Sequence, residues 1–199
     1  MKKHSSGNTA AARRKRIRRT ADLSRETWLN AAYTILESEG VEQIKIERLG
    51  RMLGLSKGSF YGQFKNRGEL MQALLAHWRG EMLSWIEIAR ANQGDDLAAN
   101  LRFILDIVEK NAWLRFDSAL RIWAKQDSDV AKVVDEIDSA RISLLLDIFA
   151  RGGITGEDAR ARADVFYGYT IFVGVARSRP FSKTDKRLFE RAARWLASP

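Results

Sequence analysis

The spacing of apolar residues along the chain predicts helices throughout. In the first third of the chain, Ile46, Leu49 and Leu53 recur at positions i, i+3 and i+7, which is the spacing of one buried helical face. A little further on, Phe60 and Phe64 lie four positions apart and share a second buried face. Comparable stripes run through the later segments, and the sequence has no alternating strand pattern of useful length and no internal repeat. The predicted fold class is therefore all-α, with about nine helices.

A break between the first two of these stripes predicts a tight turn. Gly54 can adopt a positive φ that other residues resist, and Ser56 is a good N-cap for a new helix. Two short helices joined by a three-residue turn that contains glycine form a helix-turn-helix, whose second helix enters the major groove of DNA. We place this motif at residues 45–64.

A third helix is expected to support the motif. Ser24 can cap its start and Gly40 can end it. Neither short helix of the motif is long enough to be stable alone, so both need an apolar face to pack on. We expect that face to consist of Trp28, Ala31, Ala32, Ile35 and Leu36.

A long helix is expected to follow the motif. Asn66 and Glu69 have the spacing of an N-cap and its N3 partner, and the apolar stripe after them continues to about Asn92. These features define a DNA-binding domain at residues 22–82 and a second helical domain at residues 83–199. The remaining five helical segments begin near Asp95, Trp113, Ser128, Thr155 and Ser182.

Positive charge is concentrated at the N-terminal end of the chain. The formal net charge is +9, and residues 1–21 carry eight basic side chains and no acidic one, so the rest of the chain is close to neutral. Within that rest, residues 45–67 carry six basic side chains against Glu47 alone. This distribution is typical of a protein that holds a polyanion at one end.

Residues 1–21 contain one large apolar residue, Ile17, and are expected to form a basic disordered arm. In one interpretation the arm follows DNA phosphates or inserts an arginine into a minor groove. In the other it is a solvated tail without a role in binding. Both interpretations are open at this point.

Composition argues against several other classes of protein. The chain has no cysteine, and His4 and His77 are its only histidines, which leaves little material for a zinc site or a Ser-His-Asp triad. We find no nucleophile–base pair and no phosphate-binding loop, so no enzymatic activity, cofactor or metal is expected. No apolar run approaches the roughly 20 residues that span a bilayer, and no secretory signal follows the basic N-terminus, so we expect a cytoplasmic protein that does not contact membranes.

The second helix of the motif supplies most of the expected DNA contacts. Lys57 and Ser59 lie in its first turn, which reaches base edges, and lysine can donate to guanine O6 or N7. Ser56 and the exposed amides beside it can hold a phosphate, and Gly58 lets the backbone come close. Residues one turn later, and those at the start of the first helix, are expected to meet phosphates. The full expected set is Lys45, Arg48, Ser56, Lys57, Gly58, Ser59, Tyr61, Gln63 and Lys65.

The last two segments carry more apolar residues than one core needs. Between residues 165 and 176 apolar side chains point in every direction, so the helix needs cover on both sides. A second copy of the chain can supply that cover, because helix-turn-helix proteins commonly use two-fold symmetry to bind two half-sites. The alternative is a central helix of a monomer. The expected dimer interface consists of Val165, Gly168, Phe172, Val175, Leu188, Ala192 and Trp195.

The stretch from Ser56 to Asn66, SKGSFYGQFKN, is similar to the recognition-helix signature of the TetR (tetracycline-repressor-like) family of bacterial transcription regulators. The family's N-terminal pattern covers Trp28 through Leu75, and the likeness beyond it is only architectural. The resemblance implies a DNA-binding domain, dimerisation through the last two helices, and a small molecule bound between C-terminal helices. The sequence departs from the family pattern at Lys45, where Ser or Thr is common, and at Gln63, where His is common.

The expected function is that of a homodimeric repressor of transcription. It would bind a palindromic operator in double-stranded DNA, and a small-molecule effector would release it. An architectural or ligand-independent DNA-binding protein that uses the basic arm is the alternative. Arg115, Asp117 and Arg121 can orient a polar group of the effector or can be solvated. Aromatic and apolar candidates for the effector site, each of which can instead fill the core, are Trp113, Phe116, Leu120 and Trp123.

Overall fold

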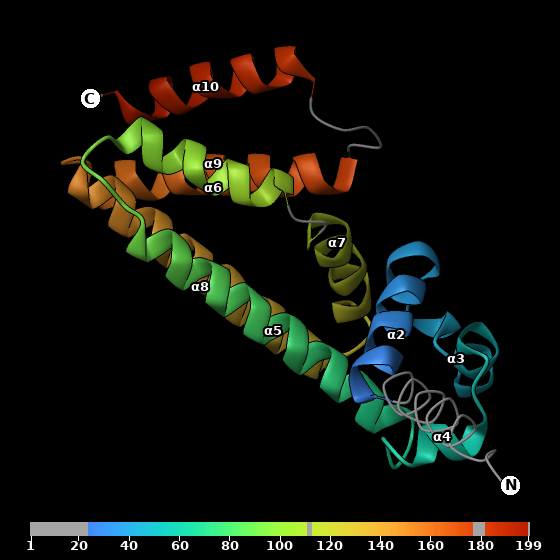
Figure 1. Ribbon diagram of the computed structural model, residues 1–199. Coiled ribbons are helices and arrows are strands. Elements are labelled where there is room, and N and C mark those ends of the chain that lie inside the picture. The colour runs from blue at the N-terminus through green and yellow to red at the C-terminus, as the bar shows by residue number, and fades with distance from the viewer. Residues whose placement is uncertain (1–23, 111–112, 177–181, 199) are drawn as a thin grey trace, which may run out of the picture. The chain divides into compact units, whose positions relative to one another are not determined.

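The computed structural model describes residues 24–110, 113–176 and 182–198, and within them it contains nine α-helices, one 3₁₀-helix and no strand (Figure 1). The predicted all-α fold is confirmed. The chain forms two compact units, of which the first ends at Leu74 and the second begins at Leu75, both within one long helix. The elements are α2 (Arg25–Glu39), η1 (Val41–Gln43), α3 (Ile46–Leu53), α4 (Lys57–Tyr61), α5 (Arg67–Ala91), α6 (Leu97–Lys110), α7 (Trp113–Ala124), α8 (Ser128–Arg151), α9 (Gly156–Ala176) and α10 (Lys183–Ala197).

An aromatic core holds the first unit together. Trp28 of α2 packs edge-to-face on Phe60 of α4, with ring centroids 5.2 Å apart, and Phe60 stacks on Phe64 at 5.4 Å. All three rings are almost fully buried. The Tyr33 hydroxyl donates to the carbonyl of Leu74 at 2.8 Å, which ties α2 to the first part of α5. The predicted apolar face of α2 therefore carries out its expected role.

Two glycines shape the turn between α3 and α4. Gly54 has a φ of +65°, as its place in the turn predicted, and its N–H donates back to the carbonyls of Gly50 and Arg51. The Leu55 N–H also donates to the Gly50 carbonyl, at 2.8 Å. A Cβ on Gly50 would lie 2.9 Å from the Leu55 carbonyl oxygen, so a larger residue cannot fit there without moving the backbone. The need for glycine at position 50 was not predicted.

The second helix of the motif is shorter than predicted. α4 ends at Tyr61, so Gln63 and Lys65 lie in the turn that precedes α5 and not one turn further along a helix. Asn66 caps α5 by accepting the N–H of Glu69 at 2.9 Å, while the Glu69 carboxylate accepts the N–H of Lys65 at 2.8 Å. The turn is thus fixed by hydrogen bonds even though it is not helical.

Arg67 at the start of α5 has a structural role. Its guanidinium donates to the carbonyl oxygens of Ile44 at 2.6 Å and Val41 at 2.8 Å. These bonds engage backbone acceptors at the first residue of η1 and just after its end, and they hold that segment against α5. Arg67, one of the six basic residues counted between residues 45 and 67, therefore helps to hold the fold together.

The second unit is built around α8. This helix packs on α7, α9 and α6, and α10 packs on α6. The later part of α5 runs alongside α8 (Figure 1). Ion pairs from Arg79 to Glu136 and from Arg90 to Asp147 link the two helices. The side chain of Asp127 caps α8.

The described ranges contain neither a membrane-spanning helix nor a metal-binding group of side chains. No helix in them is both long enough and apolar enough to cross a membrane. They also hold no group of three or more His, Asp or Glu side chains arranged to bind a metal ion. The basic arm predicted at residues 1–21 lies outside the described residues.

Candidate nucleic-acid interface and buried cavity

The helix-turn-helix has an apolar inner face and a polar outer face. On α4, Phe60 is fully buried whereas its neighbour Tyr61 is 56% exposed. None of the nine expected DNA-contacting residues is buried in the core. The exposed members are Lys45, Ser56, Lys57, Gly58, Tyr61 and Lys65, and the partly exposed ones are Arg48, Ser59 and Gln63.

Lys57 of α4 forms an ion pair with Glu47 of α3. The Lys57 Nζ lies 2.7 Å from the Glu47 Oε1, and both side chains are exposed. This hydrogen bond lowers the pKa of the Glu47 carboxyl and raises the pKa of the Lys57 ammonium, so both stay charged near neutral pH. The positive charge of Lys57 is therefore largely offset by its neighbour. The sequence showed both residues but not that they pair.

The other basic side chains of this face differ in how they are engaged. Arg48 binds the carboxylate of Glu39, at the end of α2. Lys45 and Lys65, in contrast, make no ion pair with any other residue that the structure describes. These two lysines are the clearest sources of uncompensated positive charge on the face.

Arg25 holds the chain in place just before Lys65. Its guanidinium stacks on the Phe64 ring, 4.2 Å from the centroid, and donates to the Gln63 carbonyl at 2.8 Å. It also pairs with Glu69 at 3.1 Å. The pKa of Glu69 is lowered, first by the backbone N–H of Lys65 and then by Arg25. Arg25 was missed by the sequence reasoning, because its partners lie about 40 residues away.

The backbone at the start of α4 is open on its outer side. Ser56 caps the helix by accepting the Ser59 N–H at 3.2 Å, as its spacing predicted. A Cβ on Gly58 would meet only the Ser56 Oγ, at an ordinary contact distance of 3.6 Å. The fold therefore does not require glycine at position 58, in contrast to position 50.

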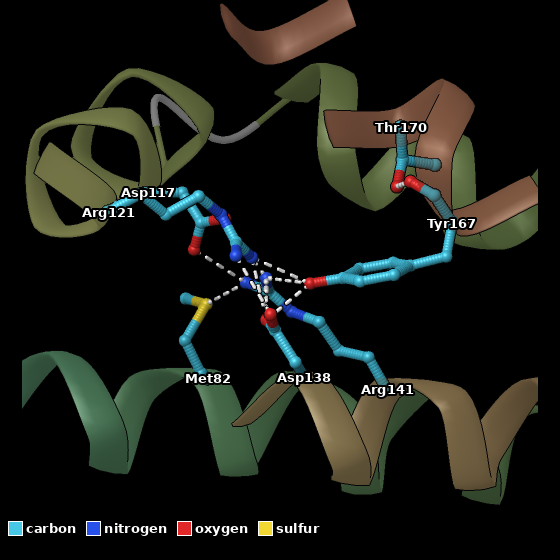
Figure 2. Close-up of polar contacts among 7 residues, drawn as sticks. All are labelled: Met82, Asp117, Arg121, Asp138, Arg141, Tyr167 and Thr170. Carbon is cyan, nitrogen blue, oxygen red and sulfur yellow. Dashed lines mark hydrogen bonds and ion pairs between the residues drawn. The ribbon is translucent and has the colours of Figure 1, made fainter. Parts of the chain in front are cut away.

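A cluster of five polar side chains lies between α7, α8 and α9 of the second unit (Figure 2). We call Asp117, Arg121, Asp138, Arg141 and Tyr167 the polar cluster. Arg121 donates to Asp138 at 2.6 Å, and Arg141 donates to Asp117 at 3.1 Å. The Tyr167 hydroxyl donates to Asp138 and accepts from Arg121 at 2.8 Å and from Arg141 at 3.2 Å. Two positive and two negative charges thus compensate one another.

The pKa values in the polar cluster follow from burial and pairing. Burial alone would lower the pKa of Arg121 and raise that of Asp138, but their mutual hydrogen bond and the surrounding charges outweigh it and shift each pKa the other way. Both groups therefore stay ionised. Burial, together with the bond to Asp138, raises the pKa of Tyr167 to about 12 although Arg141 opposes this shift.

A cavity of about 100 Å³ lies beside the polar cluster. It is lined by residues of α5, α6, α8 and α9, most of them apolar, and Arg141 and Tyr167 form part of its wall. The predicted effector residues Phe116, Leu120 and Trp123 are buried but do not line this cavity, and the side chain of Trp113 lies outside the described residues.

Large apolar side chains are exposed on α9 and α10. Val165 is 57% and Phe172 61% exposed on α9, while Leu188 is 58% and Trp195 70% exposed on α10. In each pair the two residues lie seven positions apart and so share one face of their helix. Of the other expected interface residues, Gly168 is exposed, Ala192 is partly exposed, and the side chain of Val175 is outside the described part of the structure.

Comparison with known proteins places these features in a family context. The sequence model for "Bacterial regulatory proteins, tetR family" matches residues 29–74. A nucleoid occlusion factor SlmA from Glaesserella parasuis serovar 5 (strain SH0165) is 29% identical over 75 residues, which is 37% of this chain and 37% of that protein. SlmA from Actinobacillus pleuropneumoniae serotype 5b (strain L20) is 25% identical over 167 residues, covering 79% of this chain and 82% of that protein.

Solved structures show that the fold is shared. The transcriptional regulator FadR from Bacillus subtilis, in complex with stearoyl-CoA, matches with a TM-score of 0.65 and 16% identity over 88% of this chain and 98% of that chain. A TetR transcription regulator from Haloarcula marismortui ATCC 43049 matches with a TM-score of 0.62 and 16% identity over 87% of this chain and 95% of that one. At these identities the likeness is one of architecture.

Proposed function

The chain belongs to the TetR family of bacterial DNA-binding regulators, which are not enzymes, and on this basis we propose that it is a homodimeric, effector-released repressor. The observation that supports DNA binding most strongly is the two-faced helix-turn-helix. Its aromatic side is buried against α2, and its polar side presents Lys45 and Lys65, which make no ion pair with the other residues that the structure describes. A protein with this role acts in the cytoplasm, where the chromosome lies.

The proposed contacts fall into two groups. Lys57 and Ser59 meet base edges, and Gly58 allows the backbone to come close to the duplex. The others position the protein on phosphates and sugars, and these are Lys45, Arg48, Ser56, Tyr61, Gln63 and Lys65. Because Lys57 is paired in the free protein, contact with a guanine requires it to leave Glu47 or to share it. A released Glu47 can accept from a cytosine amine.

Dimerisation is proposed to occur through α9 and α10. The four exposed apolar side chains on these helices would be costly to leave in water, and a second copy of the same surface would bury them. An interface between identical surfaces is two-fold symmetric, and a two-fold dimer reads a palindromic operator.

The cavity in the second unit is the proposed effector site. It is largely apolar, has a few polar groups in its wall and lies within one helical unit, as small-molecule sites commonly do. FadR from Bacillus subtilis, which has a similar fold, was solved with stearoyl-CoA bound. An effector bound here would favour a conformation of the dimer with lower affinity for the operator.

Footprinting with the purified full-length protein tests the proposal. At moderate salt it should protect a discrete palindromic site. Uniform protection along the DNA, with no preferred site, would contradict the proposal.

The alternative is a DNA-binding protein without an effector, using its basic arm. The observation that favours this second candidate is the similarity to nucleoid occlusion factors over much of the chain. Deleting residues 2–19 distinguishes the two: the repressor should keep its site preference, whereas the alternative should lose nearly all binding.

A further inference from the structure

Two hydrogen-bond donors at the cavity lack a good acceptor. The indole Nε1 of Trp85, a residue that lines the cavity, is buried and has no hydrogen-bond partner within the described residues. The second donor is Nη2 of Arg141, which binds Asp117 at 3.1 Å and the thioether sulfur of Met82 at 3.0 Å (Figure 2). A thioether is a weak acceptor, so one N–H of this guanidinium is poorly satisfied.

The other polar groups in the cavity wall have already used their donors. The Thr170 hydroxyl donates to the carbonyl of Tyr167 at 2.7 Å, and the Tyr167 hydroxyl donates to Asp138. Most of the remaining lining is aliphatic or aromatic, including Ile86, Ile104 and Phe166. The cavity therefore offers a ligand hydrogen-bond donors and a large apolar surface. It offers few free acceptors, so a ligand gains little from hydrogen-bond donors of its own.

The charges at the cavity do not favour an anionic guest. The two arginines of the polar cluster are matched by its two aspartates, each in direct contact with an arginine. An additional carboxylate would lose its hydration and would find no uncompensated positive charge in exchange. A neutral acceptor loses much less on entering an apolar site.

From these contacts we propose that the cavity binds a small neutral molecule that is mainly apolar and carries one acceptor oxygen, such as the carbonyl of a ketone or ester. The Trp85 indole N–H and the Arg141 guanidinium donate to that oxygen, and the apolar wall encloses the remainder. A dry cavity of roughly 150 Å³ accommodates benzene, which has six non-hydrogen atoms, so about 100 Å³ suits a guest of roughly four non-hydrogen atoms. This inference rests on the proposed role of the second unit as an effector domain.

Three probes with four non-hydrogen atoms each test the class of ligand: acetone, 2-methylpropane and acetate. Each is titrated into the full-length protein without DNA, and binding is followed by ligand-observed NMR. Acetone should bind saturably, and acetate should not bind at concentrations that saturate the protein with the ketone. Tighter binding of the carboxylate than of the ketone would overturn the proposal.

Variants test the two donors. Trp85→Phe keeps a ring but removes the N–H, so it should weaken the binding of acetone by about tenfold and leave the binding of 2-methylpropane nearly unchanged. Trp123→Phe is the matched control, because Trp123 is a buried tryptophan of the same unit that does not line the cavity. Its affinity for the ketone should equal that of the wild type. An unchanged ketone affinity in Trp85→Phe would rule out the indole as the donor.

A second variant covers the case in which Trp85→Phe does not fold. Met82→Leu removes the weak sulfur acceptor, so Arg141 gains more from a ligand oxygen and acetone should bind several-fold more tightly. Unchanged or weaker binding would remove Arg141 from the site. Since no DNA is present, these results do not depend on operator binding. If the ketone binds but does not change the affinity for operator DNA, the proposed release by an effector is wrong, whereas the proposed class of ligand stands.

Discussion

At the scale of single residues, the outer face of the helix-turn-helix combines groups with different roles. Ser56 caps α4, Glu47 pairs with Lys57, and Lys65 is held in position by its backbone while its ammonium makes no ion pair among the described residues. Identical residue types therefore differ in what they can offer to a duplex. Substitutions on this face should separate into effects on stability, on overall affinity and on base preference.

Two glycine substitutions should have opposite consequences. Gly50→Ala places a methyl group against the Leu55 carbonyl and should lower the free energy of unfolding of the first unit by about 1–3 kcal/mol, as measured by urea denaturation. Gly58→Ala should leave the stability unchanged or slightly higher, because it has room and alanine favours helix. It should nevertheless weaken DNA binding, since the methyl group keeps the backbone away from the duplex. Wild-type affinity in Gly58→Ala would remove this residue from the interface.

Lysine substitutions should differ in their salt dependence. Lys65→Ala should weaken binding to all DNA sequences and reduce the slope of log K against log salt by roughly 0.9, because one phosphate contact is lost. Lys57→Ala should change the slope less, since Glu47 already offsets its charge, but it should relax the preference for the operator.

The matched control is Lys132→Ala, an exposed lysine on α8 of the second unit, which should behave as the wild type in the same filter-binding titrations. An unaltered salt slope in Lys65→Ala would exclude a phosphate contact by that residue.

Local rules predicted some of these residues and missed others. Gly54 and Ser56 were predictable, because a positive φ and an N-cap depend on immediate neighbours. Gly50 was not, because its constraint comes from the chain folding back on it. The pairing of Lys57 with Glu47 joins two helices whose relative orientation the sequence does not state.

At the scale of helices, apolar spacing predicted the elements better than their ends. Phe60 and Phe64 are both buried as expected, yet only Phe60 lies in α4, because a turn can place the later ring in the core equally well. The polar cluster was beyond prediction for a similar reason. Asp117 and Arg121 have the i, i+4 spacing of a helical pair and Asp138 and Arg141 the i, i+3 spacing, but the contacts that join these pairs to each other and to Tyr167 run between α7, α8 and α9.

The polar cluster should make the second unit sensitive to high pH. The pKa of Tyr167 is raised to about 12 in the folded protein, whereas an unfolded tyrosine has a pKa of about 10. Between these values the folded state binds more protons than the unfolded state, so stability is fully present below pH 10 and is lost as pH rises to 12. The loss should be roughly 2 kcal/mol in urea unfolding.

Tyr167→Phe is the control for this effect. It should be less stable at neutral pH, because Asp138 loses a donor, but its stability should fall less between pH 10 and 12. An equally steep fall in the variant would assign the pH dependence to other groups.

At the scale of the whole molecule, two copies of the chain are proposed to meet through the apolar faces of α9 and α10. Trp195→Glu should convert the dimer to a monomer in sedimentation equilibrium without unfolding it, because the side chain is 70% exposed. Ile122→Glu changes an equally apolar side chain that is 60% exposed on α7, and this control should remain dimeric. A dimeric Trp195→Glu would place the interface elsewhere.

If α4 contacts DNA as proposed, the ion pair between Lys57 and Glu47 would affect how the protein searches a chromosome. A genome presents an enormous excess of irrelevant sites, and every unpaired cation on the reading face increases capture by them. A lysine that is paired with a carboxylate adds little to this non-specific binding. In the proposed interface, Lys57 would leave Glu47 only where a base edge competes successfully with the carboxylate, so the pair would add discrimination without slowing the scan of bulk DNA.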